Sequence, residues 1–449
     1  MSLPVDTRDA PLAPGTASLP RARVFLLFLV VLVTAAGNTA MQSVMPSIGT
    51  ALKVEDFWIS LAYTWSALLW MICAPMWARR SDRRGRKAMM AIGLTGFIAS
   101  FSLCGAALWF GLNGWLSGVA TLLVFAAARS LYGGFGSAAP PAVQAYVASR
   151  TSRAERTQAL SLIASSFGLG TVLGPALAPL LILPGLGLVS PFAAFTLVAA
   201  VVLVTLRLRL PDDSPAYAAK GDVIAAPFSA NSDTRPPGGS GTEGDIPAAA
   251  AEVGRLNWRD SRLRPWLLAG LLGGHAQAAI LGIVGFLILD RLGLRATPAL
   301  AAGPTGLVLM AGAGASLLAQ WGIIPLLHLG PRTSSLWGIS LAGIGIALIA
   351  VATQLHTIAL GMAIASLGFG LFRPGFTAGT SLAVSRAEQG QSAGIVASVN
   401  GAAYIFAPAA GVWLYGHSPW IGFAAIEALC AAVLLLGIRG MTPDAELIR

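Results

Sequence analysis

Apolar stretches long enough to cross a lipid bilayer recur along the whole of this chain. A helix needs about 20 mostly apolar residues to span the hydrocarbon core. Only 11% of the 449 residues are charged, whereas soluble domains carry about 25%, so a soluble fold could not cover its surface with polar side chains. We therefore predict an all-α membrane protein with twelve transmembrane helices. The twelve stretches lie at about 22–48, 57–78, 88–110, 115–148, 157–182, 191–208, 265–289, 300–327, 334–353, 357–384, 391–415 and 419–438.

The first stretch is expected to stay in the protein as a transmembrane helix. It follows Arg21 and Arg23, as the apolar part of a signal peptide would. It is too long for a signal peptide, however, and it continues through Asn38 and Gln42. We therefore interpret it as a retained span.

The basic residues are distributed unevenly between the two sides of the membrane. If the loops are assigned alternately to the two sides, 24 of the 29 Lys and Arg residues share the side of the N-terminus. Cytoplasmic loops carry such an excess, so both termini are predicted to be cytoplasmic, in a multi-pass protein of the bacterial inner membrane. This topology accounts for the net charge of +10 without a nucleic acid partner, and no aromatic-basic binding motif accompanies the charge.

A polar segment divides the twelve stretches into six and six. Residues 209–264 are rich in Pro, Gly, Ala, Ser and acidic residues, a composition typical of disordered linkers. Its end, RLNWRDSRLRPW (255–266), has four arginines and two tryptophans and is expected to lie along the inner lipid headgroups. The predicted parts are a cytoplasmic N-terminal tail (1–21), a six-helix bundle (22–208), a cytoplasmic disordered linker (209–264), a second six-helix bundle (265–438) and a cytoplasmic C-terminal tail (439–449).

The two halves repeat one another at a nearly constant offset. The offset of 233 to 234 residues holds through polar positions, which is harder to obtain by chance than isolated Gly and Pro matches. Since both copies start on the same side of the membrane, they are predicted to be parallel repeats related by an axis along the membrane normal. The matches pair GFG at 134–136 with 368–370, Pro140 with Pro374, Glu155 with Glu388, Gln158 with Gln391, and Pro175 with Pro408.

The loop between the second and third stretches carries a basic motif, ARRSDRRGRKAMM (78–90). Ordinary positive-inside topology also places basic residues in such a loop. Its spacing matches G-x-x-x-D-R-x-G-R-[KR] except that Ala78 replaces the first glycine. In this motif the sequence resembles the major facilitator superfamily, in which the element latches the cytoplasmic ends of helices in one transport state. Glycine permits a tight turn here, and the carboxylate can cap a helix N-terminus. The resemblance implies a gating role for Asp82, Arg83, Gly85, Arg86 and Lys87.

An arginine stands inside the fourth stretch, in RSLYGGFGSAAPP (129–141). Arg129 lies about 14 residues into the stretch, or about 21 Å along a helix. A charge at such depth is costly in lipid and normally faces a cavity or a partner; the alternative is that it snorkels to the headgroups. The pattern R-x-x-Y-G-G-x-G resembles the superfamily's fourth-span motif, whose arginine is linked to proton coupling. Tyr132, three residues on, is expected on the same helix face.

The fifth stretch contains GLGTVLGPALAP (168–179). Gly170 and Gly174 permit close helix approach and Pro175 interrupts the backbone ladder, although ordinary helix packing uses such residues too. The pattern resembles the exporter signature G-x-x-x-G-P-x-x-G-G, with Ala-Pro in place of the final Gly-Gly. Residues 144–179 as a whole resemble the twelve-span drug:proton antiporters of the superfamily, including tetracycline-efflux-type proteins. The resemblance implies a conformational role for these residues, and export rather than uptake.

The residue that carries the proton is less clearly marked. Antiporters of this group commonly place a carboxylate in the first span, where this sequence reads TAAGNTAMQSVMP (34–46) without an acid. Besides Arg129, three titratable residues are candidates. Glu427 lies well inside the last stretch, where a helix-packing role is equally open. His275 lies near mid-depth of the seventh stretch, where a neutral histidine bound to a carbonyl is the favoured alternative, and Asp290 lies at its outer end.

Polar and aromatic residues at helical spacing outline a predicted substrate cavity. In the superfamily the first, fourth, seventh and tenth spans line the central path. Two arginines without a paired acid, Arg129 and Arg373, favour an anionic or zwitterionic substrate, and Tyr63 and Trp70 of the second stretch can stack on a planar molecule. The cavity candidates are Asn38, Gln42, Tyr132, Gln277, Phe369, Arg373, Thr377, Asn400 and Tyr404.

The sequence contains no recognisable catalytic motif. Its four histidines and three cysteines are scattered, without metal-ligand spacing, and it has neither a P-loop nor a serine elbow. We predict no enzyme activity, metal or cofactor. The leading hypothesis is proton-coupled export of a small organic molecule, drug-like or a metabolite, by a monomer in contact with membrane lipid. The alternative is an importer, by symport or facilitated diffusion, of an anionic metabolite or an iron chelate.

Overall fold

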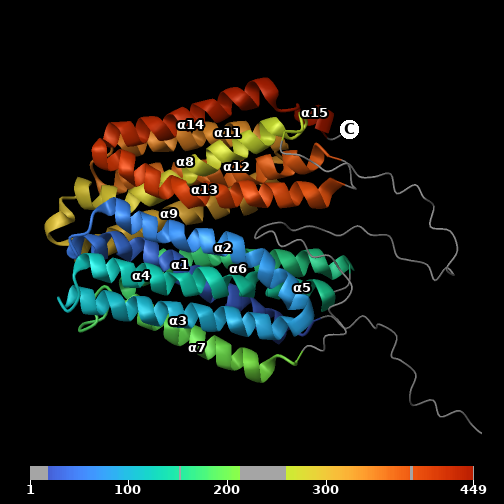
Figure 1. Cartoon of the computed structure of the whole chain (residues 1–449). Coiled ribbons are helices and arrows are strands. Elements are labelled where there is room, and N and C mark those ends of the chain that lie inside the picture. The colour runs from blue at the N-terminus through green and yellow to red at the C-terminus, as the bar shows by residue number, and fades with distance from the viewer. Residues whose placement is uncertain (1–18, 151–152, 213–258, 385–387, 448–449) are drawn as a thin grey trace, which may run out of the picture.

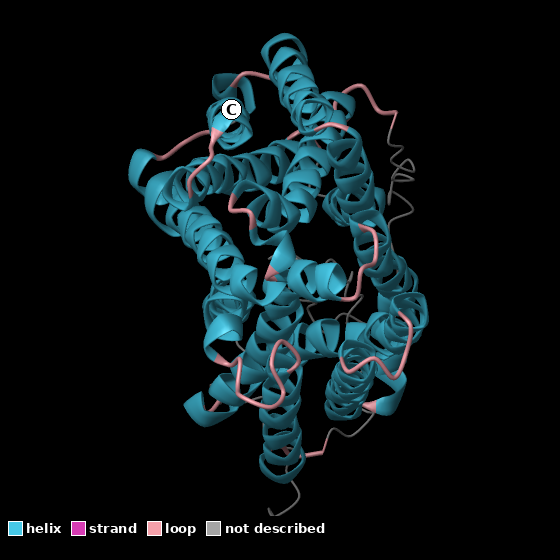
Figure 2. Cartoon of the chain, turned by 90° about the vertical axis from the view of Figure 1, so that its left-hand side faces the viewer, coloured by secondary structure: helices cyan, strands magenta, loops and turns pink. Residues whose placement is uncertain are grey.

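The computed structural model describes residues 19–150, 153–212, 259–384 and 388–447. Helices make up almost all of this part of the chain (Figure 2). The β-structure found among these residues is one isolated bridge between Leu183 and Gly187. The prediction of an all-α protein is therefore confirmed.

The first half of the chain forms one bundle of helices and the second half forms another, and the two lie side by side (Figure 1). The first bundle consists of α1 (Arg21–Ala51), α2 (Asp56–Arg84), α3 (Arg86–Leu112), α4 (Gly118–Phe135), α5 (Ala139–Arg150), α6 (Arg153–Leu180) and α7 (Ser190–Arg209). The second consists of α8 (Arg264–Arg291), α9 (Ala302–Leu318), α10 (Ile324–Leu327), α11 (Pro331–Val351), α12 (Leu355–Leu382), α13 (Gln389–His417), α14 (Pro419–Gly440) and α15 (Asp444–Leu447).

The helices reproduce the predicted succession of spans. Eleven helical segments of the described residues are long and apolar enough to cross a membrane. The remaining long helix, α6, has 28 residues and packs against α1, at the place of the fifth predicted stretch. We call the end of the molecule where α1 begins and α14 ends the terminal end, and the opposite end the distal end.

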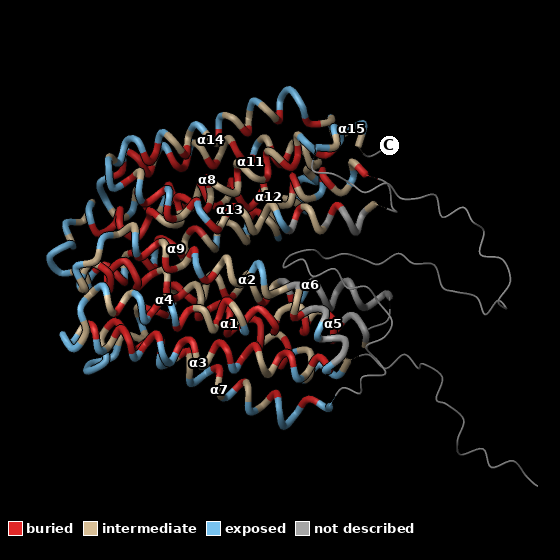
Figure 3. Tube along the Cα trace, viewed as in Figure 1, coloured by how far each residue is buried: buried red, intermediate tan, exposed pale blue. Residues whose placement is uncertain are grey.

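Side-chain burial agrees with a bundle surrounded by lipid. Buried residues face the interior of each bundle, whereas exposed ones lie along the outer helices (Figure 3). On α7, Leu197, Val201, Val204 and Leu208 are all more than half exposed, and their spacing puts them on one helix face. In water such an apolar stripe would be unfavourable, so this face suits contact with acyl chains.

The fourth span is interrupted in the first repeat but continuous in the second. A short 3₁₀ turn, Gly136–Ala138, separates α4 from α5, whereas α12 runs without a break through Pro374. The difference follows from Pro140 and Pro141, which stand next to each other and remove two successive backbone donors from the helix. A single proline in α12 removes only one, and the helix tolerates it.

Small residues and prolines bring the two bundles into contact. Gly306 of α9 lies against the backbone of Pro175 and the ring of Pro179 in α6, and Gly285 of α8 lies against the ring of Pro46 in α1. A side chain at either glycine would collide with its neighbour, so these positions let helices of opposite bundles approach closely.

The two ends of the second bundle differ in detail from the sequence prediction. Most of the predicted linker lies outside the described residues, as does the N-terminal tail up to residue 18. Trp266, expected at the headgroups, is instead fully buried against Gly379 of α12, because α8 already begins at Arg264. The C-terminal tail includes a short helix, whose Asp444 accepts hydrogen bonds from the backbone N–H groups of Arg332 and Thr333 at the start of α11.

Candidate functional site

Arg129 of α4 is buried inside the first bundle rather than directed to the headgroups. Its side chain is 2% exposed, and its Nη2 donates a hydrogen bond of 2.9 Å to Oδ1 of Asn38 in α1. Two aromatic rings flank the guanidinium: its Cζ lies 4.7 Å from the ring centroid of Tyr132 and 5.8 Å from that of Tyr63 in α2. The snorkelling alternative is therefore wrong for this structure.

The guanidinium is only partly satisfied by its surroundings. Among the described residues, Nε and Nη1 of Arg129 are buried without a hydrogen-bond partner, and no described carboxylate forms an ion pair with it. The hydroxyl of Tyr63 is also buried, and it has no hydrogen-bond partner in the part of the chain that the structure describes. Buried donors without acceptors are costly, and cation–π contacts recover part of that cost. The cluster is therefore suited to receive an acceptor, such as a carboxylate or a phenolate oxygen.

Side chains of α2 fix the part of α4 that carries this arginine. Ser66 donates from Oγ to the carbonyl oxygen of Arg129 at 3.3 Å, and Trp65 donates from Nε1 to Oγ of Ser130 at 2.7 Å. Four residues further along α4, the carbonyl oxygen of Gly134 accepts a hydrogen bond of 2.5 Å from Nε1 of Trp77. These bonds hold α4 in register with α2, so the guanidinium has a defined position.

A shell of aromatic rings packs behind Tyr132. Its ring centroid lies 5.2 Å from that of Trp70 and 5.7 Å from that of Phe97. Of this cluster, the sequence indicated Asn38, Tyr132 and Arg129 as site residues, and Tyr63 and Trp70 as stacking groups. It did not indicate that Asn38 is the hydrogen-bond partner of Arg129, because pairing between helices leaves no local pattern.

The second bundle contains a weaker counterpart of the contact between Arg129 and Asn38. Nη2 of Arg373 in α12 lies 3.5 Å from Oδ1 of Asn400 in α13, so both predicted arginines face an asparagine on a neighbouring helix. Thr377 and Tyr404 are partly buried, whereas Phe369 is 1% exposed and presents no surface to a substrate in this conformation.

Three further predicted residues, His275, Gln277 and Gln42, lie on α8 and α1. Nδ1 of His275 lies 2.7 Å from the carbonyl oxygen of Leu271 one turn earlier. From the sequence, such a carbonyl partner was favoured over a role of this histidine in proton transport. Oε1 of Gln277 is buried without a hydrogen-bond partner in the described part of the chain. Gln42 is partly buried in α1.

Glu427 lies away from both arginine clusters. It belongs to α14, and its carboxylate faces Gly343 of α11. Its Oε1 is buried and, among the described residues, has no hydrogen-bond partner. This position between two helices of one bundle matches the helix-packing alternative that the sequence left open.

Asp290 belongs to an ionic network at the distal end. It accepts a hydrogen bond of 2.7 Å from Nε of Arg295 and one of 3.0 Å from the hydroxyl of Tyr415 in α13. Arg295 also donates from Nη1 and Nη2 to the two carboxylate oxygens of Asp56, at 2.9 and 2.6 Å. Since Asp56 begins α2, this pair joins the two bundles. The carboxylate of Asp56 raises the pKa of Arg295 above its ordinary value.

The basic motif between α2 and α3 forms the predicted turn. Gly85 has a φ of 86°, in the left-handed region that favours glycine. Nη1 of Arg86 donates to the carbonyl oxygen of Ala145 in α5 at 2.6 Å, and Nζ of Lys87 lies 2.8 Å from Oδ1 of Asp212 after α7. The motif therefore ties three helices together at the terminal end. The side chains of Asp82 and Arg83 lie outside the described part of the structure.

The glycines of the fifth span lie against the first span. A side chain at Gly174 would collide with the carbonyl oxygen of Ala36 and the hydroxyl of Thr39 in α1. Thr39 in turn donates from Oγ1 to the carbonyl oxygen of Gly170 at 3.2 Å. Because Pro175 contacts α9 of the other bundle, α6 presents Gly170 and Gly174 to its own bundle and Pro175 and Pro179 to the opposite one.

The fold and this site define a membrane transporter, not an enzyme: two helical bundles meet at a distal ionic contact, and one of them buries a partly unsatisfied arginine. The family model of the Major Facilitator Superfamily matches residues 27–330, more than half of the chain. The protein belongs to this superfamily and is an integral, multi-pass membrane protein.

Among curated proteins, similarity is found to transporters and to multidrug resistance proteins. The chain is 30% identical over 190 residues to the probable actinorhodin transporter of Streptomyces coelicolor, covering 42% of this chain and 30% of that protein. It is 30% identical over 185 residues to multidrug resistance protein 2 of Bacillus subtilis, covering 40% of this chain and 43% of that protein. The matches therefore span less than half the length of these relatives. They agree with the predicted likeness to drug-efflux transporters.

Solved structures share the fold over nearly the whole chain. The human organic anion transporter MFSD10 (TETRAN) superposes with a TM-score of 0.60 at 19% identity, covering 93% of this chain and all (100%) of that one. The inward-open xylose transporter XylE of E. coli superposes with a TM-score of 0.67 at 14% identity, covering 94% and 96%. Identities this low establish the fold alone.

Proposed function

We propose that this protein exports a small organic molecule by alternating access, in exchange for protons. The observation that carries the proposal is the buried guanidinium of Arg129, with two nitrogens that lack acceptors among the described residues. The relatives named as a probable actinorhodin transporter and a multidrug resistance protein support drug or metabolite export as the function class.

The charge of the site favours an anionic group on the substrate. Arg129 is permanently charged, and the described residues around it supply an amide, two phenols and aromatic rings but no carboxylate. An anion entering this cluster would pair with Nε and Nη1, whereas a cation would be repelled. The nearby rings of Tyr63 and Tyr132 suit a planar, aromatic body carrying that anion.

The sign of the substrate charge also bears on direction. Moving one charge through a potential of 100 mV changes its free energy by about 2.3 kcal/mol. A membrane that is negative inside therefore favours the exit of an anion and opposes its entry. Export in exchange for protons uses both the potential and the pH gradient. In the alternative, uptake of an anionic metabolite or an iron chelate, facilitated diffusion works against the potential, and symport of a monovalent anion with one proton moves no net charge and gains nothing from it.

The distal contact is proposed to be the outer gate. In the orientation predicted from the basic loops, both termini are cytoplasmic and Asp56 and Arg295 face the outside of the inner membrane. Their ion pair would hold the outer ends of the bundles together while the inner ends separate, and its release would accompany the opposite movement. The turn at Gly85, with Arg86 and Lys87, would hold helices at the inner end. We expect these movements within a monomer.

The test is flux through purified protein in proteoliposomes with an imposed pH gradient. The probes are a panel of planar aromatic carboxylates and their neutral methyl esters, quantified inside the vesicles by mass spectrometry. We expect gradient-dependent accumulation of at least one carboxylate and of none of the esters. Arg129→Lys should reduce that flux at least tenfold, because lysine cannot reproduce the planar fork of donors, whereas Arg207→Lys at the exposed end of α7 should not. Full flux in Arg129→Lys would remove the site from the transport path.

A further inference from the structure

A groove lies outside both bundle cores, at the terminal end of the second bundle. It runs between the segment that leads into α8 and the last two turns of α14, and it has a volume of about 590 Å³. At the level of the helix ends, Gly440 approaches the ring of Pro265: a side chain at Gly440 would start 3.3 Å from it. The lining residues are Arg259, Ser261, Arg264, Pro265, Leu268, Ala432, Leu435, Leu436, Arg439 and Gly440.

The rim of the groove is basic. Arg259, Arg264 and Arg439 all line it, and all three are exposed. They come from two segments more than 170 residues apart in sequence, so the fold brings their charges together. Such a cluster attracts an anion, and guanidinium groups bind phosphate oxygens through paired hydrogen bonds.

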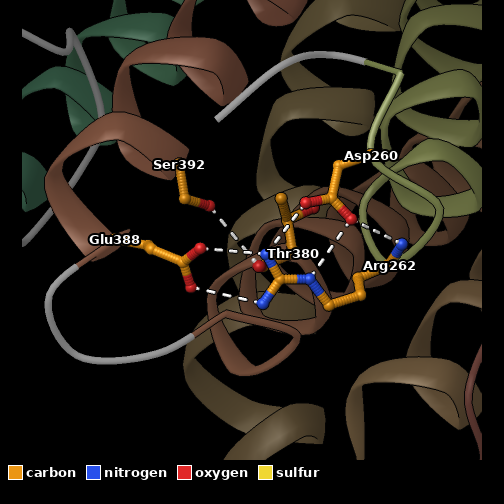
Figure 4. A network of polar contacts seen from close by, with 5 residues as sticks. All are labelled: Asp260, Arg262, Thr380, Glu388 and Ser392. Carbon is orange, nitrogen blue, oxygen red and sulfur yellow. Dashed lines mark hydrogen bonds and ion pairs between the residues drawn. The ribbon is translucent and has the colours of Figure 1, made fainter. Parts of the chain in front are cut away.

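Asp260 and Asp444, the carboxylates nearest in sequence to these arginines, bind groups outside the groove. Asp260 accepts hydrogen bonds from the backbone N–H and side chain of Arg262, which also binds Glu388 at the start of α13 (Figure 4). Asp444, after α14, accepts hydrogen bonds from the start of α11. Asp260, Arg262 and Glu388 thus bind one another, and none of the three lines the groove.

The wall of the groove below this rim is apolar. Leu268 lies one turn beyond Arg264 along α8, about 6 Å deeper in the bundle. Ala432 lies about 10 Å from Arg439 along α14, and Leu435 between them is 54% exposed. Cations at the helix ends above an apolar wall match the profile of a phospholipid, with its phosphate at the membrane surface and its acyl chains below.

We propose that this groove binds an acidic glycerophospholipid. The phosphate lies among Arg259, Arg264 and Arg439, and an acyl chain lies along the leucines of α8 and α14. The lipid would bridge the start of α8 to the end of α14, next to the place where Gly440 approaches Pro265. An acidic headgroup is favoured over a zwitterionic one because a choline or ethanolamine would add a cation to three arginines.

The test is native mass spectrometry of the purified full-length protein, titrated with phosphatidylglycerol or phosphatidylcholine of identical acyl chains. We expect wild type to retain phosphatidylglycerol in strong preference. The triple variant Arg259→Gln, Arg264→Gln, Arg439→Gln should lose that preference, by about fivefold in affinity for each arginine removed. The single variant Arg439→Gln changes one exposed residue at a helix end, so we expect it to fold normally and to show a smaller loss of the preference.

Two arms distinguish this site from general charge attraction. Arg207→Gln with Arg209→Gln removes two exposed arginines from the corresponding end of α7 and should leave the preference intact. Glycerol 3-phosphate at millimolar concentration, which has the phosphate without acyl chains, should not displace the lipid. Equal retention of both lipids by wild type, an equal loss in the α7 variant, or displacement by glycerol 3-phosphate would each overturn the proposal.

Discussion

The ion pair between Asp56 and Arg295 allows a quantitative prediction about the balance between conformations. Asp56→Asn keeps the size of the side chain and removes its charge, so the contact between the bundles loses its ionic component. Arg295 keeps its bond to Asp290, since that residue lies in the same bundle. The substitution therefore weakens the link across the interface while leaving the local structure of the α8–α9 loop in place.

The size of the effect follows from the exposure of the pair. The side chain of Arg295 is 39% exposed and that of Asp56 is 19% exposed, so water screens much of the attraction. Pairs of this kind contribute about 0.5–1 kcal/mol, and 1.4 kcal/mol corresponds to a factor of ten in an equilibrium. We therefore expect Asp56→Asn to shift the equilibrium toward the form that is open at the distal end by about twofold to fivefold.

Distance distributions between spin labels at the distal end measure this shift. Suitable sites are Asn113, after α3, and Thr353, before α12, because both are exposed and lie in loops of opposite bundles. The labels require a background without the native cysteines. We expect a larger fraction of long distances in Asp56→Asn, and no change in the control Glu446→Gln, which removes an exposed carboxylate from α15 at the terminal end. Identical distributions in wild type and Asp56→Asn would refute the assignment of this pair as a gate.

Two further predictions concern the terminal end. Asp82→Asn should slow flux at least tenfold at normal membrane abundance, because the resemblance implies that this carboxylate latches one transport state; wild-type flux in Asp82→Asn, equal to that of the control Glu446→Gln, would contradict it. The second prediction concerns Asp260, whose pKa is lowered mainly by the hydrogen bond from Arg262. A lowered carboxyl pKa stabilises the folded state above the ordinary aspartate pKa of about 3.9 and loses that contribution as the pH falls below it. The difference in Tm between wild type and Arg262→Gln should therefore be equal at pH 8 and pH 5, and a difference that appears only at pH 8 would count against this pairing.

The fold was predictable from the sequence because the spans are marked by the length of their apolar stretches. Each apolar stretch is long enough to be recognised alone, and the repeat fixed the correspondence between the halves without any knowledge of packing. The break after α4 was harder to predict from the sequence. Pro140 matches Pro374 in the repeat, and only the additional Pro141 distinguishes the interrupted helix from the continuous one.

The candidate site was predictable in composition but not in contacts. Arg129 was recognisable because a charge within an apolar stretch requires an explanation. Its pairing with Asn38, and the distal pair of Asp56 with Arg295, join residues 91 and 239 positions apart, and nothing in the local pattern encodes such pairs. Asp290 illustrates the same limit: the sequence offered it as a titratable candidate at the outer end of the seventh stretch, whereas the structure places its carboxylate between Arg295 and Tyr415.

The measurement that tests the central claim most directly is proton movement caused by substrate addition. Proteoliposomes are loaded with a pH-sensitive dye, their membrane potential is clamped at zero with valinomycin and equal potassium, and a transported aromatic carboxylate is added outside. Exchange of the substrate for protons predicts that the lumen becomes alkaline in vesicles with wild-type protein, and that the change is absent in protein-free vesicles and strongly reduced with Arg129→Lys. Acidification of the lumen would identify a symporter, and substrate entry without any pH change would identify transport without proton coupling; either result would contradict the account.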